Sequence, residues 1–222
     1  MGRSQIILLL KYPQEGEVKV RLGRQIGNEV VVELYRNFIL DMLVTMDGTG
    51  IPRSISFFPP ESLAPLRKWL GLALDYHPQR GQDHPERLMN TFMDASSRGE
   101  EKVVVLASDV PDLPKEVIAE AMASLESSDA VIGSSPDGGY YLIGFHRRSF
   151  RREAFQGIAW STPRAFADTI SRMSDLIVHQ LPSWPDVDTM SDLQALVRSE
   201  RNPLFRSSRT MAFLKDSGLM GQ

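Results

Sequence analysis

The sequence predicts an α/β fold in which helices cover both faces of a mainly parallel central sheet. Short apolar runs typical of strands alternate with longer segments of helical period, the order expected for parallel strands joined by helical crossovers. Two of the runs, IILLL at 6–10 and VVVLA at 103–107, show no polar alternation. A strand without alternation is buried on both faces, so these two runs should lie at the centre of the sheet.

The strand and helix candidates follow one another along the whole chain. The strand candidates are 5–12, 54–58, 70–76, 102–108, 129–133 with 140–145, and 176–181. The helical candidates are 28–43, 85–99, 114–129, 163–174 and 191–200, with an amphipathic tail at 203–217. In the first of them Val31, Leu34, Phe38 and Met42 recur three or four positions apart, so one face is apolar. We expect a single domain over residues 1–222 with a helical tail from about 190.

The composition excludes several classes of protein. With 222 residues, 42% apolar side chains, 24% charged side chains and a net charge of -3, the chain is typical of a soluble globular protein. The acidic total argues against bulk affinity for nucleic acid, and no apolar run reaches the ~18 residues of a membrane span. The absence of cysteine rules out disulfides, thiolate zinc sites and cysteine nucleophiles. We therefore expect a cytoplasmic protein without a nucleic-acid partner or a membrane span.

A cationic loop follows the first strand. The stretch KYPQEGEVKVRL at 11–22 places Lys11 at the strand end and a flexible Gly16 after it. Lys19 and Arg21 lie two apart, so they share a side if the backbone is extended. Cations gathered beside backbone amides suit phosphate groups, although a solvated basic loop gives the same pattern. The loop is not of the Walker type, because the GxxxxGK[ST] order is absent.

Carboxylates occur where two other segments reach the sheet edge. Ser108 and Asp109 follow the buried run VVVLA, and ligands bind outside the carboxyl ends of strands in open α/β sheets. Asp109 there could hold Mg²⁺ or Mn²⁺, which prefer oxygen ligands, or form a turn. For Asp112 we favour a turn that caps the next helix. Asp186 and Asp188 lie two apart, so an extended backbone points both to one side, and like charges so close favour a cation.

A glycine turn lies farther along the chain. Asp137, Gly138 and Gly139 form a turn that could bring backbone close to a ligand, and Tyr140 begins the strand after it. A plain hairpin has the same sequence pattern.

Five ordered motifs carry a resemblance to a known family. They are KYPxxGxVKxRL, SDxPDLP, DGGYYLIG, GIAWST and DVDT, spread over roughly the first 195 residues. With them the chain resembles uncharacterised bacterial transferase-like proteins of the DUF2064, or rSAM/selenodomain-associated transferase 1, type. These proteins are placed in the nucleotide-diphospho-sugar transferase superfamily, which has the GT-A, Rossmann-like fold. The first loop and DVDT also resemble their counterparts in 2-phospho-L-lactate guanylyltransferase.

The resemblance implies a nucleotide held by the first loop and a divalent metal, Mg²⁺ or Mn²⁺, held by Asp109 and an aspartate of DVDT, for which we take Asp188. The expected catalytic and metal-binding residues are thus Asp109 and Asp188. The expected nucleotide-binding residues are Lys11, Lys19, Arg21 and Ser108. The expected acceptor residues are Asp83, Asp137, Gly138, Gly139, Tyr140 and Trp160. The activity would be nucleotidyl or glycosyl transfer from a nucleoside triphosphate or nucleotide-sugar to an unknown small molecule; the alternative is a non-catalytic nucleotide-binding sensor or scaffold.

The chain departs from the family pattern at two places. Val20 stands where the family usually has threonine, which removes a hydroxyl near the expected phosphates. The segment QRGQDHPERL at 79–88 usually reads like QxGxDLGERM, so His84 and Pro85 replace the common residues. Asp83 or His84 is predicted to cap the following helix, with Pro85 in its first turn. The negative charges of Asp83 and Glu86 favour contact with an uncharged or cationic acceptor group.

Overall fold

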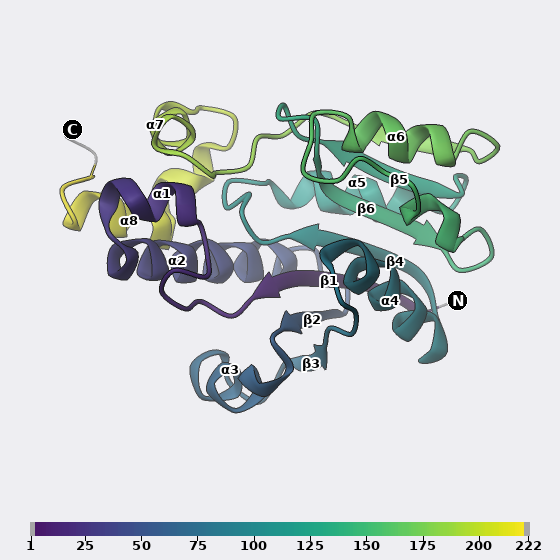
Figure 1. Ribbon diagram of the computed structural model, residues 1–222, viewed down its shortest axis with the longest axis horizontal. Helices are drawn as coiled ribbons and strands as arrows, with labels where there is room; N and C mark the ends of the chain where they lie inside the picture. The colour runs from purple at the N-terminus through teal and green to yellow at the C-terminus, as the bar shows by residue number, and fades with distance from the viewer. Residues whose placement is uncertain (1–2, 220–222) are drawn as a thin grey trace.

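The computed structural model describes residues 3–219, in which seven strands form one sheet (Figure 1). The strand order is β3-β2-β1-β4-β6-β5-β7. The bounds are Arg3–Lys11 for β1, Arg53–Phe58 for β2, Asp75–Pro78 for β3, Glu100–Ala107 for β4, Ala130–Ser134 for β5, Tyr140–His146 for β6 and Val178–Leu181 for β7. Only β6 runs antiparallel to its neighbours. The predicted α/β fold with a mainly parallel sheet is confirmed, and the unalternated runs form the adjacent strands β1 and β4.

The helices follow the strands in the predicted alternation. They are α1 Val20–Ile26, α2 Asn28–Asp47, α3 Leu63–Leu70, α4 His84–Ser97, α5 Lys115–Ser124, α6 Ala165–Arg172, α7 Met190–Arg198 and α8 Arg209–Asp216. Short 3-10 segments occur at Pro60–Ser62 (η1), Arg152–Phe155 (η2) and Pro203–Ser207 (η3). No helix within residues 3–219 has both the length and the apolar content that a membrane span requires.

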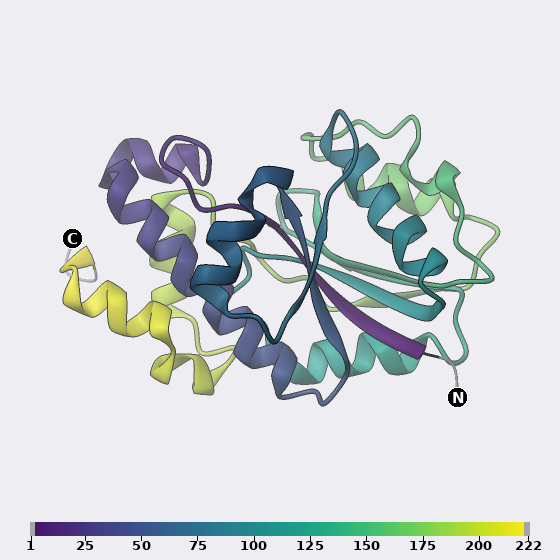
Figure 2. The same ribbon diagram turned by 90° about the horizontal axis from the view of Figure 1, so that it is seen from below.

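The sheet separates two apolar cores. Alternate side chains of β1 point to opposite faces, so Ile6 and Leu8 join the core under α2 and α5, whereas Ile7 joins the core under α4 and η2. Figure 2 shows the sheet between these two layers of helices. The C-terminal helix α8 packs along α2, in the same layer (Figures 1 and 2). Both faces of the central strands are thus covered, which leaves the strand ends as the polar edge.

Two segments differ from the prediction. Residues 20–22, expected as the end of the first loop, instead begin α1, and burial of Leu22 in the core anchors this helix. The strand expected at 70–76 is displaced to 75–78, because α3 continues through Leu70 and ends at Gly71, whose φ of +91° is accessible to glycine.

Candidate functional site

The carboxyl edge of the central strands brings distant segments together. The chain order reverses there, because β2 lies on one side of β1 and β4 on the other. Asp109 follows the end of β4, and its backbone oxygen accepts a 3.1 Å hydrogen bond from the backbone nitrogen of Val187. This bond holds the 186–188 segment against the end of β4, so Asp186 and Asp188 lie beside Asp109.

Lys19 connects two of these carboxylates. Its backbone is left-handed, with φ 44° and ψ 45°, immediately before α1. Its side chain is only 6% exposed, and Nζ donates to Asp109 Oδ2 at 2.7 Å and to Asp188 Oδ1 at 2.6 Å. Burial acts to lower the pKa of Lys19, but the charges of Asp109 and Asp188 outweigh it and raise that pKa above its ordinary value. The ammonium therefore stays charged between the two carboxylates.

Lys19 and Arg21 do not lie on an extended backbone, although both side chains approach Asp188. Because α1 begins at Val20, Arg21 lies on a helix and its side chain is 76% exposed. Its Nη1 lies 3.9 Å from Asp188 Oδ2, at the rim of the same group of charges. Lys19 alone reaches the interior of the site.

Asp109, Asp186 and Asp188 form what we call the acidic cluster. One oxygen from each lies within 4.8 Å of the others. Burial first, and then the charge of Asp109, raises the pKa of Asp186 to about 7. One ammonium among three carboxylates leaves an excess of negative charge, and carboxylate oxygens are the ligands that Mg²⁺ and Mn²⁺ prefer. The residues thus fit a divalent cation, and the structure adds Asp186 to the expected pair Asp109 and Asp188.

A narrow cavity of about 240 Å³ opens on one side of the acidic cluster. It is lined by Leu9, Leu10, Lys11, Phe58, Gln79, His84, Arg87, Ala107, Ser108 and Asp109. Two of the residues expected to bind nucleotide lie here with partners of their own. Lys11 Nζ donates to Glu17 Oε2 at 2.5 Å, and the Ser108 and Tyr35 hydroxyls lie 2.6 Å apart.

A wide cavity of about 530 Å³ opens on the other side. It is lined by Arg21, His84, Pro85, Asp137, Gly139, Tyr140, Trp160, Ser161, Thr162, Pro163, Ala165 and Asp188. The Trp160 ring meets the rings of Tyr140 and His84 edge-on, with centroids 6.0 and 6.3 Å apart. Four of the expected acceptor residues gather here: Asp137, Gly139, Tyr140 and Trp160. His84 lines both cavities and so lies between them.

Gly138 and Asp83, also expected at the acceptor, lie outside the linings of both cavities. Gly138 has φ +90°, and a Cβ there would lie 2.2 Å from the backbone oxygen of Pro163, so the turn packs closely behind the wall of the wide cavity. Asp83 caps α4 as predicted, because its Oδ1 accepts from the backbone nitrogen of Glu86 at 2.9 Å. Pro85 lies in the first turn of that helix, also as predicted.

Asp112 does not cap the next helix, contrary to expectation. Pro114 precedes α5, and Asp112 is buried, with Oδ1 accepting from Trp184 Nε1 at 2.8 Å.

Two residues of the narrow cavity, Gln79 and Arg87, were absent from the predicted site. Both belong to the 79–88 segment and match the family pattern there, which is the signal that could have identified them.

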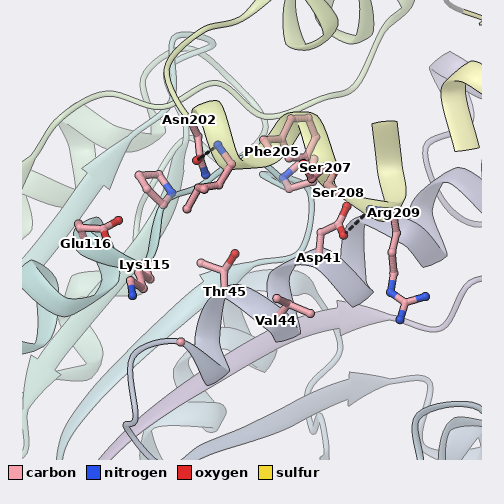
Figure 3. Close-up of a pocket in the computed structure, with 14 residues that line it drawn as sticks. Asp41, Val44, Thr45, Lys115, Glu116, Asn202, Phe205, Ser207, Ser208 and Arg209 are labelled. Atoms are coloured by element: carbon pink, nitrogen blue, oxygen red, sulfur yellow. Dashed lines mark hydrogen bonds between the residues drawn. The ribbon is translucent and has the colours of Figure 1, made fainter. Parts of the chain in front are cut away.

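A third cavity, of about 550 Å³, lies between α2, the 111–116 turn and the chain from 202 to 209 (Figure 3). None of the predicted site residues lines it. Its one buried charge, Asp41, accepts hydrogen bonds from the backbone nitrogens of Arg209 and Thr210 at 3.0 and 2.9 Å, and so caps α8. This carboxylate has a structural role, and we place the candidate site at the acidic cluster instead.

The comparisons with known proteins give the family. The model of the family described as "Uncharacterized protein conserved in bacteria (DUF2064)" matches residues 43–162. The chain belongs to this family. A solved structure from Desulfovibrio desulfuricans G20, provisionally assigned as a nucleotide-diphospho-sugar transferase, is 38% identical to this DUF2064 chain. The alignment covers 99% of this chain and 97% of the other, with a TM-score of 0.93. The resemblance drawn from the sequence motifs is thereby confirmed.

More distant structures share the fold of this DUF2064 protein. A cytidylyltransferase from Leptospira borgpetersenii serovar Hardjo-bovis is 10% identical with a TM-score of 0.58, covering 99% of this chain and 97% of the other. CMP:2-keto-3-deoxy-manno-octonic acid synthetase, solved with CTP, is 10% identical with a TM-score of 0.52, covering 87% and 96%. At such identities the likeness shows the fold alone, which is of the GT-A and nucleotidyltransferase kind. A comparison with curated proteins gives no match.

Proposed function

We propose that this DUF2064 protein is a metal-dependent transferase that binds a nucleoside triphosphate or a nucleotide-sugar. It would transfer a nucleotidyl or glycosyl group to a small-molecule acceptor. The observation that carries the proposal is the acidic cluster with Lys19, which lies between the narrow and the wide cavity. The assignment of the 38% identical relative to the nucleotide-diphospho-sugar transferases supports it.

The cations of the first loop supply the phosphate site in this proposal. Lys19 Nζ contacts both Asp109, which lines the narrow cavity, and Asp188, which lines the wide cavity, and Arg21 lies at the rim. Lys11 and Ser108 line the narrow cavity beside Asp109. Donors held in place before the reaction stabilise developing charge without the cost of reorganisation.

Asp109, Asp186 and Asp188 would hold Mg²⁺ or Mn²⁺. A bound divalent cation would neutralise the negative charge that develops on the leaving phosphate group. The three carboxylates fit this role because their oxygens converge and because Lys19 neutralises only part of their charge.

The wide cavity would receive the acceptor. Trp160 and Tyr140 provide aromatic surface, and Asp137 and Asp188 provide acceptors for hydroxyl or amino groups. In nucleotidyl transfer an acceptor oxygen attacks the α-phosphorus and diphosphate leaves. In glycosyl transfer the acceptor oxygen attacks the sugar carbon and the nucleoside diphosphate leaves. Either reaction needs the donor phosphates to lie at Lys19, between the two cavities.

A panel assay tests the proposal. Nucleoside triphosphates and nucleotide-sugars are incubated with the protein in Mn²⁺ or EDTA, with mixed small-molecule acceptors, and release of diphosphate or nucleoside diphosphate is measured. Thermal unfolding reports binding separately, because a ligand at 100 times its dissociation constant adds about 2.7 kcal/mol of stability. We expect Mn²⁺-dependent release that Asp109→Asn removes. Binding without release across the panel would favour the non-catalytic module, and neither binding nor release would contradict the proposal.

A further inference from the structure

The narrow cavity has the size and position of a subsite for one ring system. Its volume of about 240 Å³ is below the ~300–1,000 Å³ of sites that enclose a whole small ligand. Asp109 belongs both to its wall and to the acidic cluster, so a group bound in the cavity would adjoin phosphates held at Lys19. If the proposed function holds, the part of the donor that remains for this cavity is the nucleobase.

Gln79 presents a fixed side chain in this cavity. Its backbone nitrogen donates to Phe57 O at 2.8 Å, which holds it beside the end of β2. Its side-chain Nε2 donates to Ser56 O at 2.8 Å and to Leu10 O at 3.2 Å. A primary amide has two N–H donors, and here both are used by backbone carbonyls. Rotating the amide would turn its oxygen toward these two carbonyls and lose both bonds, so the orientation is fixed.

The carbonyl oxygen of the same amide remains available. Gln79 Oε1 accepts no hydrogen bond from residues 3–219, and it is not among the buried polar atoms there that lack a partner. The oxygen therefore keeps accessible surface, although Gln79 as a whole is 6% exposed. Gln79 lines the narrow cavity, and we take its accessible oxygen to face that cavity. Gln79 Oε1 is thus a hydrogen-bond acceptor for a ligand in the cavity, and the fixed amide cannot present a donor there instead.

We infer that Gln79 makes the narrow cavity selective for nucleobases that carry an exocyclic amino group. Such a group, present in cytosine, adenine and guanine, donates to a carbonyl oxygen. In the same pose the oxo group that replaces it in uracil, hypoxanthine or xanthine opposes oxygen to oxygen, and the ring N–H beside that oxo group would reach Gln79 only if the base shifted within the narrow cavity. Sites built around a buried hydrogen-bonding group discriminate strongly against analogues that leave this group unpaired. The inference rests on the proposed function, because it takes the bound ligand to be a nucleotide.

Three matched pairs of nucleotides test the inference on the unmodified protein. They are CTP with UTP, ATP with ITP, and GTP with XTP, each pair exchanging one amino group for an oxo group. Dissociation constants are measured by calorimetric titration in Mg²⁺. We expect the amino member of at least one pair to bind tenfold or more tightly than its partner. Equal binding within all three pairs would overturn this inference alone, whereas no binding of any of the six, or of the nucleotide-sugars in the panel, would overturn the proposed function and the inference with it.

A variant then assigns the preference to Gln79. Gln79→Met keeps an unbranched side chain of similar length and removes the amide oxygen, so the amino preference should fall below about twofold. Thermal unfolding verifies that the variant folds, and Gln82→Met, at an exposed position of the same segment, serves as the matched control. A folded Gln79→Met protein that keeps the preference would show that another residue reads the base. If Gln79→Met does not fold, Gln79→Ala, which also removes the amide oxygen, replaces it in the same pairs, and an unchanged preference would overturn the inference equally.

Discussion

The two cavities that meet at His84 are built in different ways. The narrow cavity is walled by the ends of β1 and β4 and by Gln79, whose amide is held by two backbone carbonyls. The wide cavity is walled by the loops at 137–140 and 160–165, where Gly138 has φ +90° and Ser161 has φ 59°. Left-handed backbone at a residue other than glycine costs energy that surrounding contacts must offset.

The two walls differ in how tightly their polar atoms are held. The strand ends that wall the narrow cavity are held by the hydrogen bonds of the sheet and by the two cores. The polar atoms of this wall are therefore fixed in position. A wall of loops depends on a few close packing contacts, such as that of Gly138 against Pro163. Loops tolerate sequence change better than strands. We therefore expect the donor to depend on single atoms of the narrow side and the acceptor on the shape of the wide side.

The largest effect is expected for Asp109→Asn, which removes one charge shared by the narrow cavity and the acidic cluster. Nucleotide affinity in Mn²⁺ should fall by about 100-fold or more, since even outer-shell partners of metals change affinity by ~10–100-fold. Affinity in EDTA should stay near that of the parent, and Asp188→Asn should behave alike. The control is Asp175→Asn, which removes the same charge at an exposed ion pair with Arg151. If Asp109→Asn responds to Mn²⁺ as the parent does, the cation does not bind at the cluster.

The next largest effect is expected for Lys19→Met, which should weaken triphosphate binding but strengthen Mn²⁺ binding. Triphosphate affinity should fall about 10–100-fold, because hydrogen bonds to charged groups contribute roughly 1.5–3 kcal/mol. Direct Mn²⁺ binding without nucleotide should instead tighten, because the ammonium no longer lies between Asp109 and Asp188. Calorimetric titration measures both affinities. Arg21→Ala, at the exposed rim, should weaken triphosphate binding less, and an equal loss of nucleoside and triphosphate binding in Lys19→Met would exclude a phosphate role.

A smaller effect is expected for Gly138→Ala, which should disturb the wall of the wide cavity and leave that of the narrow cavity unchanged. Gly138→Ala adds a Cβ 2.2 Å from Pro163 O at a left-handed position, so it should reduce the free energy of unfolding by roughly 1–3 kcal/mol. Hydrogen exchange should rise at 137–140 and 160–166, while nucleotide affinity stays within about twofold. Gly16→Ala is the matched control, because Gly16 has φ +72° but no atom within 4 Å of the added Cβ. Its loss of stability should be smaller, and equal losses would mean that the contact with Pro163 does not hold the turn.

The smallest effect is expected for Asp83→Asn. Asparagine is also a good helix cap, so the free energy of unfolding should change by less than about 0.5 kcal/mol. Nucleotide affinity should stay within about twofold, and any loss should appear in transfer to the acceptor. Titration and thermal unfolding measure the first two quantities, and the panel assay measures the third. A loss confined to nucleotide affinity would place Asp83 on the donor side.

The fold was predictable because its signals are local. The unalternated runs of β1 and β4 and the apolar stripe of α2 repeat at the periods of strand and helix. Helix α1 was missed because its seven residues, with Gly23 among them, are too short to show a period. Its omission also misplaced Arg21 relative to Lys19.

The candidate site was predictable only where a residue follows a strand or belongs to a family motif. Asp109 and Asp188 could be predicted from their positions and from the family motifs. Lys19 contacts both carboxylates because its own backbone is left-handed immediately before α1, and no local sequence pattern predicts that conformation. Gln79 acquires its fixed orientation from the carbonyls of Ser56 and Leu10, which only the folded sheet brings together.

A crystal structure of the protein soaked with Mn²⁺ and a nucleoside triphosphate that binds in the titrations would show whether the acidic cluster holds the cation. Anomalous scattering locates the manganese independently of the nucleotide. We predict manganese at bonding distance from oxygens of Asp109 and Asp188. The phosphates should lie at Lys19 and the base in the narrow cavity beside Gln79. Manganese away from the acidic cluster, or a nucleotide in the cavity next to Asp41, would contradict the account.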